Sequence, residues 1–110
     1  MTIFKKIIDK EIPSEILYES PRILAIKDIA PVAPVHILIM PKREIKRFQD
    51  IQLSDLPLIS EMMGIAVKLA NDFGIGDNYR LLTNNGSDAG QSVQHLHFHL
   101  IGGRKLGPIA

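Results

Sequence analysis

Three of the four histidines in this 110-residue chain lie within five positions, at His95, His97 and His99. Because side chains on a β-strand alternate between its two faces, a strand through this segment would place the three imidazoles on one face. The apolar residues between them would point the other way, into a core. Chance rarely aligns three side chains that titrate near neutral pH, so this segment is a stronger candidate for chemistry than for ordinary surface histidines.

Two kinds of chemistry suit such a row. One is metal binding, since imidazole is a common ligand. On a strand, however, the Cα atoms of His95 and His99 would lie about 13 Å apart, so a single ion would need a further ligand, such as His36 or Asp88. The other is nucleophilic catalysis, in which a neutral imidazole attacks phosphorus and the modified histidine is then hydrolysed.

The loop that precedes the histidines favours the reaction at phosphorus. Residues 84–92 read Asn-Asn-Gly-Ser-Asp-Ala-Gly-Gln-Ser. Glycines allow close approach of the backbone, successive N–H groups can bind an anion, and Asn84 and Ser92 add side-chain donors. A glycine-rich loop alone usually marks only a turn. Directly before three histidines it predicts a phosphate site, and we expect neither a metal nor a cofactor there.

The remaining pattern predicts the elements that must hold this site. A short helix capped by Thr2 should run to about Lys10, and a long helix capped by Ser54 should run to about Asp72 and end at Phe73-Gly74. Expected strands cover residues 16–19 and 23–27 as a hairpin, 35–40 as a doubly covered central strand, 79–83, and 93–101. The long helix has more apolar surface than one face of a small sheet would cover, which favours a homodimer.

Composition sets limits on the function. The chain carries 13 Lys and Arg against 12 Asp and Glu, a net charge of +1, which argues against binding to nucleic acid by bulk charge. Cysteine is absent, so disulfides, thiolate catalysis and cysteine zinc sites are excluded. No apolar stretch is long enough for a membrane span. We expect a single domain over residues 1–110 in a soluble cytoplasmic protein, with no membrane or nucleic-acid partner.

The motif His-x-His-x-His followed by two apolar residues, at positions 95–101, resembles that of the histidine triad (HIT) family. Within that family the chain is similar to the Hint branch, the histidine triad nucleotide-binding proteins. The third histidine is kept where the uridylyltransferase-like branch has glutamine, and Gly102-Gly103 follows the triad. Matching segments span nearly the whole chain: residues 3–4, 7–8, 11–13, 28–31, 33–36, 39–42, 84, 86–88, 90–93 and 102–104.

This resemblance implies an α+β, HIT-like fold with a mostly antiparallel sheet, one long and one short helix, and a sheet continued across a homodimer. It implies a purine nucleotide substrate and nucleoside phosphoramidase activity. His97 would be the nucleophile that forms a nucleotidyl-histidine. His99 would hydrogen-bond the α-phosphate, and His95, with His36 nearby, would orient the nucleophile.

The resemblance also implies nucleotide contacts: Ser92 near the leaving group, backbone groups of Gly90, Gln91 and Ser92 at the phosphate, Asp28 at the ribose, Asn84 at the ribose or phosphate, and Ile29, Phe4, Ile7 and Ile12 near the base. The chain departs from the branch at Gln94, a position often aromatic there. Its tail, residues 105–110, also lacks an aromatic residue that some relatives have. Two other functions stay open: a non-catalytic nucleotide-binding or adaptor module, and a histidine-ligated metalloprotein.

Overall fold

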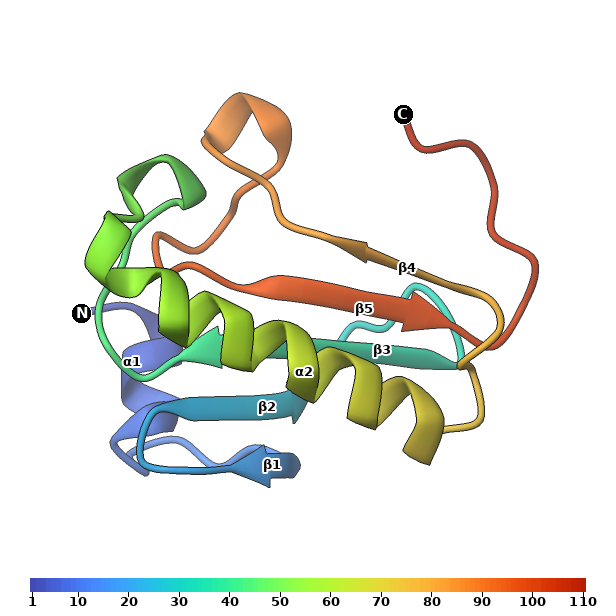
Figure 1. The fold of residues 1–110 in the computed structure, drawn as a ribbon, viewed down its shortest axis with the longest axis horizontal. Coiled ribbons are helices and arrows are strands. Elements are labelled where there is room, and N and C mark those ends of the chain that lie inside the picture. Colours follow the sequence, from blue (N-terminus) through green and yellow to red (C-terminus); the bar gives the residue numbers. More distant parts are fainter.

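A five-stranded antiparallel sheet forms the centre of the structure, a computed structural model that describes residues 1–110. The strand order is β1-β2-β3-β5-β4 (Figure 1). The strands are β1 (Ile16–Glu19), β2 (Ile23–Lys27), β3 (Val35–Pro41), β4 (Tyr79–Leu82) and β5 (Phe98–Gly102). The helices are α1 (Ile3–Ile8) and α2 (Leu56–Asp72), with short 3-10 turns η1 (Phe48–Asp50), η2 (Leu53–Asp55) and η3 (Ser87–Ala89).

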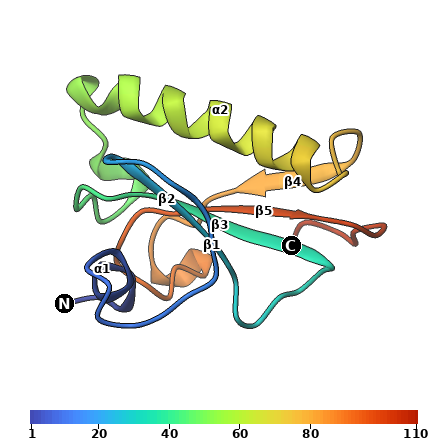
Figure 2. The same cartoon turned by 90° about the horizontal axis from the view of Figure 1, so that it is seen from below.

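The two faces of the sheet carry different layers. Figure 2 shows α2 on one side of the sheet and α1, with η3, on the other. Alternation along β3 sends Ile37 and Ile39 into the core beneath α2, and Leu38 and Met40 into a smaller cluster with α1. The expectation of a doubly covered central strand is therefore confirmed. By the same alternation His36 lies on the α1 side.

The predicted start of the long helix is wrong, because a short 3-10 turn precedes the helix. Ser54 is not its N-cap; it lies within η2, and α2 begins at Leu56. The turn is stabilised by Asp55, which is buried and accepts the backbone N–H of Gln52 at 2.9 Å, and which also pairs with Arg43. The expected end is confirmed, since Gly74 takes a φ of 73°, a conformation that favours glycine.

The strand expected over residues 93–101 begins only at Phe98. Upstream of it the backbone bonds to groups outside a ladder: the Leu96 N–H donates to Ile45 O at 2.6 Å. Pro41, at the end of β3, has no N–H with which to extend the pairing, and the His95 ring occupies its carbonyl. His95 and His97 therefore lie in an irregular segment, and only His99 is placed by strand alternation.

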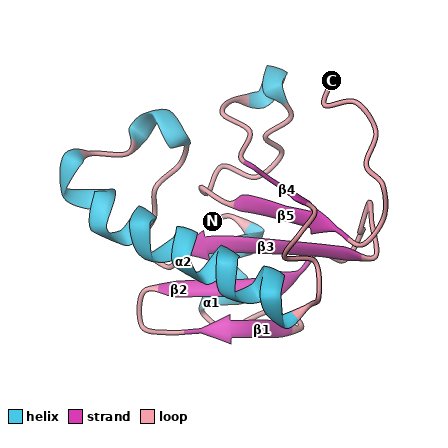
Figure 3. Ribbon diagram, turned by 45° about the vertical axis from the view of Figure 1, so that its right-hand side comes forward, coloured by secondary structure: helices cyan, strands magenta, loops and turns pink.

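The other expected elements are confirmed. Thr2 caps α1 by accepting the Lys5 N–H at 3.1 Å, and β1 and β2 form the predicted hairpin. After β5 the chain continues as loop to its C-terminus (Figure 3). None of the helices combines the length and apolar character that crossing a lipid bilayer requires.

Candidate functional site

All four histidines gather on the α1 side of the sheet. The ring centroids of His97 and His99 are 5.1 Å apart, and those of His99 and His36 are 5.2 Å apart. His95 lies deepest, with 1% of its surface exposed, and is linked to His97 through its own carbonyl. The order along the row is therefore His95, His97, His99, His36.

His36 is not where the resemblance placed it. We expected it near His95, but its Nε2 lies 2.9 Å from His99 Nδ1 and 3.3 Å from Asp28 Oδ2. The reason is topological: β3 and β5 are neighbours, and His36 pairs with Ile101, the residue two positions after His99. Any effect of His36 on His97 must therefore pass through His99.

Hydrogen bonds define the tautomers of the two inner histidines. His97 Nδ1 lies 2.7 Å from the His95 carbonyl, which can only accept, so the proton is on Nδ1 and Nε2 keeps its lone pair. The same reasoning places the proton of His95 on Nε2, which lies 2.7 Å from the Pro41 carbonyl. His97 thus presents a free imidazole nitrogen as it would need to for nucleophilic attack.

Burial keeps these rings neutral. Desolvation lowers the pKa of His95 and of His97 below the ordinary 6.5, despite the carbonyl that each ring contacts. The pKa of His99 is lowered to about 4, first by burial and then by the neighbouring His97 and His36. Near neutral pH these three rings are therefore uncharged bases and donors.

Two contacts to His97 were not predicted from the sequence. Thr83, at the end of β4, donates its hydroxyl to the His97 carbonyl at 2.6 Å. The Phe4 ring meets the His97 ring edge-on at a centroid distance of 4.8 Å. The strand pattern of residues 79–83 gave no signal for the first contact, because it depends on where the irregular segment runs.

The glycine-rich loop offers fewer phosphate donors than expected. The Gly90 N–H donates to Ser87 O at 3.0 Å, and the Gln91 N–H donates to Gly86 O at 3.1 Å. The Gln91 side chain is buried and bonds Gly86, Lys46 and Val93. In this loop conformation these two N–H groups brace the loop, and phosphate binding by Gly90 and Gln91 stays a prediction.

Ser92 and Asn84 remain available for a ligand. Ser92 is exposed, and neither its N–H nor its hydroxyl bonds to another group of the chain. Asn84 is half-buried and its amide is also unbonded; a Cβ added at Gly90 would lie 3.5 Å from its Nδ2. The loop therefore offers the Ser92 N–H and hydroxyl and the Asn84 amide as donors that are not bonded within the chain.

The residues expected at the ribose and base are divided between surface and core. Asp28 is largely buried; one carboxylate oxygen accepts the Ala30 N–H at 2.8 Å and the other faces His36. Phe4 and Ile7 are core residues with 7% exposure each. Ile29 is 92% exposed and Ile12 is half-buried, so these two retain apolar surface for a base.

Asp28, His36 and His99 also offer one ligand atom each within 4.8 Å of one another, as a metal site would. The hydrogen bonds oppose that use. His36 Nδ1 accepts the Val32 N–H at 3.2 Å, so the proton of the neutral ring is on Nε2, the atom that would have to face the ion. Metal binding would therefore require that bond to break and the ring to change tautomer.

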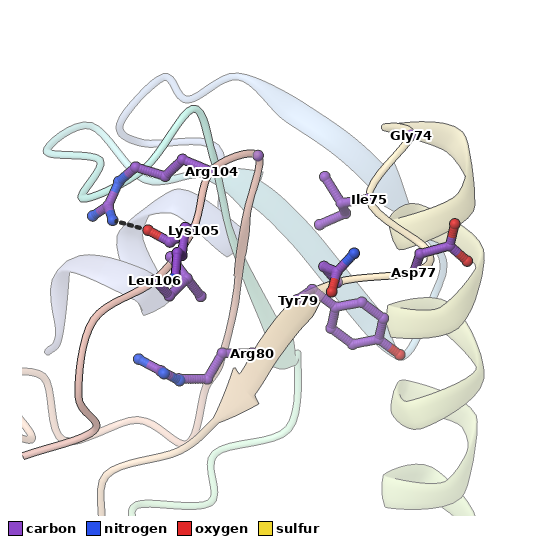
Figure 4. A pocket seen from close by; sticks show the side chains of 10 residues that line it. Gly74, Ile75, Asp77, Tyr79, Arg80, Arg104, Lys105 and Leu106 are labelled. Carbon is purple, nitrogen blue, oxygen red and sulfur yellow. Dashed lines mark hydrogen bonds between the residues drawn. The ribbon is translucent and has the colours of Figure 1, made fainter.

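A cavity lies away from the histidine row, between the segment after α2, β4 and the C-terminal tail (Figure 4). Its volume is about 810 Å³, and its lining includes Asp77, Tyr79, Arg80, Arg104 and Lys105. None of the residues expected to bind nucleotide lines it.

Known proteins are similar to this chain in sequence and in fold. Residues 9–106 match the HIT domain family. The chain is 53% identical over 110 residues to a HIT-like protein of Chlamydia pneumoniae, with 100% of both chains covered. A HIT family hydrolase from Clostridium thermocellum superposes with a TM-score of 0.93 at 49% identity, covering 97% of this chain and 94% of the other. The histidine triad nucleotide-binding protein of Candida albicans gives a TM-score of 0.82 at 32% identity, covering 100% of this chain and 86% of that one. With four histidines assembled in one row on this fold, the chain belongs to the HIT domain family.

Proposed function

We propose that this protein is a hydrolase of the Hint branch that cleaves purine nucleoside 5′-phosphoramidates into a nucleoside monophosphate and an amine. The observation that carries the proposal is the state of His97, a buried neutral ring whose Nδ1 is bonded to the His95 carbonyl and whose Nε2 is free. Relatives of the same fold include proteins named as HIT family hydrolases and as a nucleotide-binding protein, which agrees with this function.

The reaction has two steps. In the first, His97 Nε2 attacks the α-phosphorus, a nitrogen–phosphorus bond forms, and the bond from phosphorus to the amine breaks as the amine gains a proton. In this proposal the exposed Ser92 hydroxyl forms a hydrogen bond with the leaving amine. In the second, water attacks the nucleotidyl-histidine, releases the monophosphate and restores the neutral imidazole.

The phosphate oxygens need donors that strengthen as negative charge develops. The Ser92 N–H and the His99 ring supply them in this proposal, while Asn84 reaches the ribose or phosphate. Asp28 accepts bonds from the ribose hydroxyls, and Ile29 and Ile12 contact the purine. No cofactor takes part.

The active form in this proposal is a homodimer joined through α2 and β4. β4 pairs only with β5, so one edge of β4 has unpaired backbone groups that a second copy can satisfy. On α2, Leu56 and Val67 are 49% and 54% exposed, although both are apolar. Sedimentation equilibrium should give a dimer, and Val67→Glu should shift it toward monomer; a monomeric wild-type protein would reject this part.

The direct test is AMP release from adenosine 5′-phosphoramidate by the wild-type protein and by His97→Ala. We expect release by the wild type, an adenylyl adduct on His97 in rapidly quenched samples, and neither in the variant. Glu15→Ala is the control, because Glu15 is exposed before β1, away from α2 and β4, and its side chain pairs only with Lys27, at 3.5 Å. Turnover that persists in His97→Ala would disprove the nucleophile. AMP binding without any turnover would instead favour the nucleotide-binding module.

A further inference from the structure

The protonation of the outer histidines depends on a backbone group. The Val32 N–H can only donate, and it lies 3.2 Å from His36 Nδ1, so that nitrogen carries the lone pair and Nε2 carries the proton. His36 Nε2 in turn lies 2.9 Å from His99 Nδ1. Two N–H groups cannot face each other at that distance, so His99 Nδ1 must be unprotonated and its proton must be on Nε2.

This tautomer matters for the reaction. With its proton on Nε2, His99 can donate to a phosphate oxygen. With its proton on Nδ1, it would present a lone pair to the same oxygen and repel it. The Val32 N–H, together with Asp28 Oδ2 at 3.3 Å from His36 Nε2, therefore favours the tautomer in which His99 acts as a donor.

Val32 lies in an exposed loop without regular structure, residues 28–34, and its own side chain is 57% exposed. The contact that holds the Val32 backbone comes from beyond β5 and is made to the Val32 carbonyl, in the peptide that follows the Val32 N–H. Arg104 Nη2 donates to Val32 O at 2.8 Å, while Arg104 Nη1 donates to Lys105 O at 2.9 Å, the bond drawn in Figure 4. Arg104 thus joins the loop to the tail.

The turn before Arg104 brings the two segments together. Gly103 has a φ of 97°, and a Cβ added there would lie 2.9 Å from the Pro34 Cβ. Only glycine allows the exit of β5 to press against the end of the 28–34 loop in this way. The Gly-Gly-Arg sequence after the triad therefore serves to deliver the guanidinium to Val32.

We propose that Arg104 is a positioning residue: by holding the carbonyl of Val32, it keeps the backbone of this residue in place, so that the Val32 N–H fixes His36 and, through it, keeps the proton of His99 on the nitrogen that faces the substrate phosphate. The catalytic consequence rests on the proposed function, whereas the tautomer itself is a property of the free protein and can be measured without substrate.

The test is NMR of protein labelled with ¹⁵N histidine, since the shifts of Nδ1 and Nε2 distinguish the two tautomers and the charged ring. In the wild type, His36 and His99 should both be protonated on Nε2 and His97 on Nδ1. Arg104→Ala should give mixed tautomers at His36 and His99 and leave His97 unchanged. Arg104→Lys, which keeps a donor, should restore part of the wild-type pattern and serves if Arg104→Ala folds poorly.

Arg80→Ala is the matched control. Arg80 lines the same cavity and also holds the tail, through a 2.9 Å bond to Gly107 O, but makes no hydrogen bond to the 28–34 loop. Wild-type tautomers in Arg104→Ala, or equal changes in Arg104→Ala and Arg80→Ala, would overturn the proposal.

Turnover adds a second readout. Arg104→Ala should lower kcat/KM for the phosphoramidate by about tenfold, comparable to losing one charge-assisted hydrogen bond. If the wild type releases no AMP, the proposed function fails, but the tautomer measurement still decides the role of Arg104.

Discussion

His99 allows a quantitative test of whether burial lowers the pKa values of the histidine row. Burial, with His97 and His36 contributing, lowers the pKa of His99 to about 4, whereas the same side chain in the unfolded chain should have the ordinary value of 6.5. At pH values between about 4 and 6.5, His99 binds a proton in the unfolded state but not in the folded state. The free energy of unfolding contributed by this group is therefore fully present above pH 6.5 and falls as the pH drops toward 4.

The size of the effect follows from the pKa difference. At about pH 5 the unfolded His99 is almost fully protonated and the folded one is almost neutral, which costs about 2 kcal/mol of unfolding free energy relative to about pH 7.5. His99→Gln removes this cost, because the amide does not titrate. Groups distant from His99 contribute nearly equally to both proteins, so they cancel in the difference.

The assay is urea unfolding followed by circular dichroism, for wild type and His99→Gln, at both pH values. We expect the wild-type free energy of unfolding to fall by about 2 kcal/mol more than that of the variant. His99→Gln will shift stability at both pH values through lost packing, so only the difference between the two falls is diagnostic. Equal falls would refute a depressed pKa for His99 and, with it, the burial argument for the row.

Three further outcomes are expected. Burial lowers the pKa of His97, so the acid limb of kcat/KM for phosphoramidate hydrolysis should be centred below pH 6.5; a limb at or above that value would contradict a buried neutral nucleophile. Leu100→Ala should lower the free energy of unfolding by about 2–5 kcal/mol in urea titrations, because Leu100 is fully buried in the core beneath α2; a loss no larger than that of an exposed residue would contradict this packing. Gln91→Ala should cost about 1–3 kcal/mol in the same measurement, since it leaves partners at Gly86, Lys46 and Val93 unpaired, whereas the exposed Gln94→Ala should be nearly neutral; equal effects would show that Gln91 does not brace the loop.

Much of the fold follows from local sequence rules. The cap at Thr2, the hairpin of β1 and β2, the apolar central strand β3 and the glycine stop after α2 each depend on residues close together in the chain. The alternating histidines likewise indicate a chemical site by their spacing alone. Such features are readable because periodicity and capping act over a few residues.

The arrangement of the site depended on contacts between distant segments. His36 lies beside His99 because β3 pairs with β5, and His95 and His97 lie outside the strand because Pro41 ends the ladder there. Backbone carbonyls set the tautomers of His95 and His97, the Val32 N–H sets that of His36, and the His36 ring sets that of His99.

Local sequence patterns therefore predict which residues could do chemistry and which elements carry them. The three-dimensional arrangement is needed to learn which ring nitrogen holds a proton, which N–H groups of the loop are unbonded, and that Arg104 reaches Val32. Hydrogen bonds and desolvation act over a few ångströms in space. The groups that meet in this site come from segments up to 72 residues apart in the chain, so a local sequence pattern does not show that they meet.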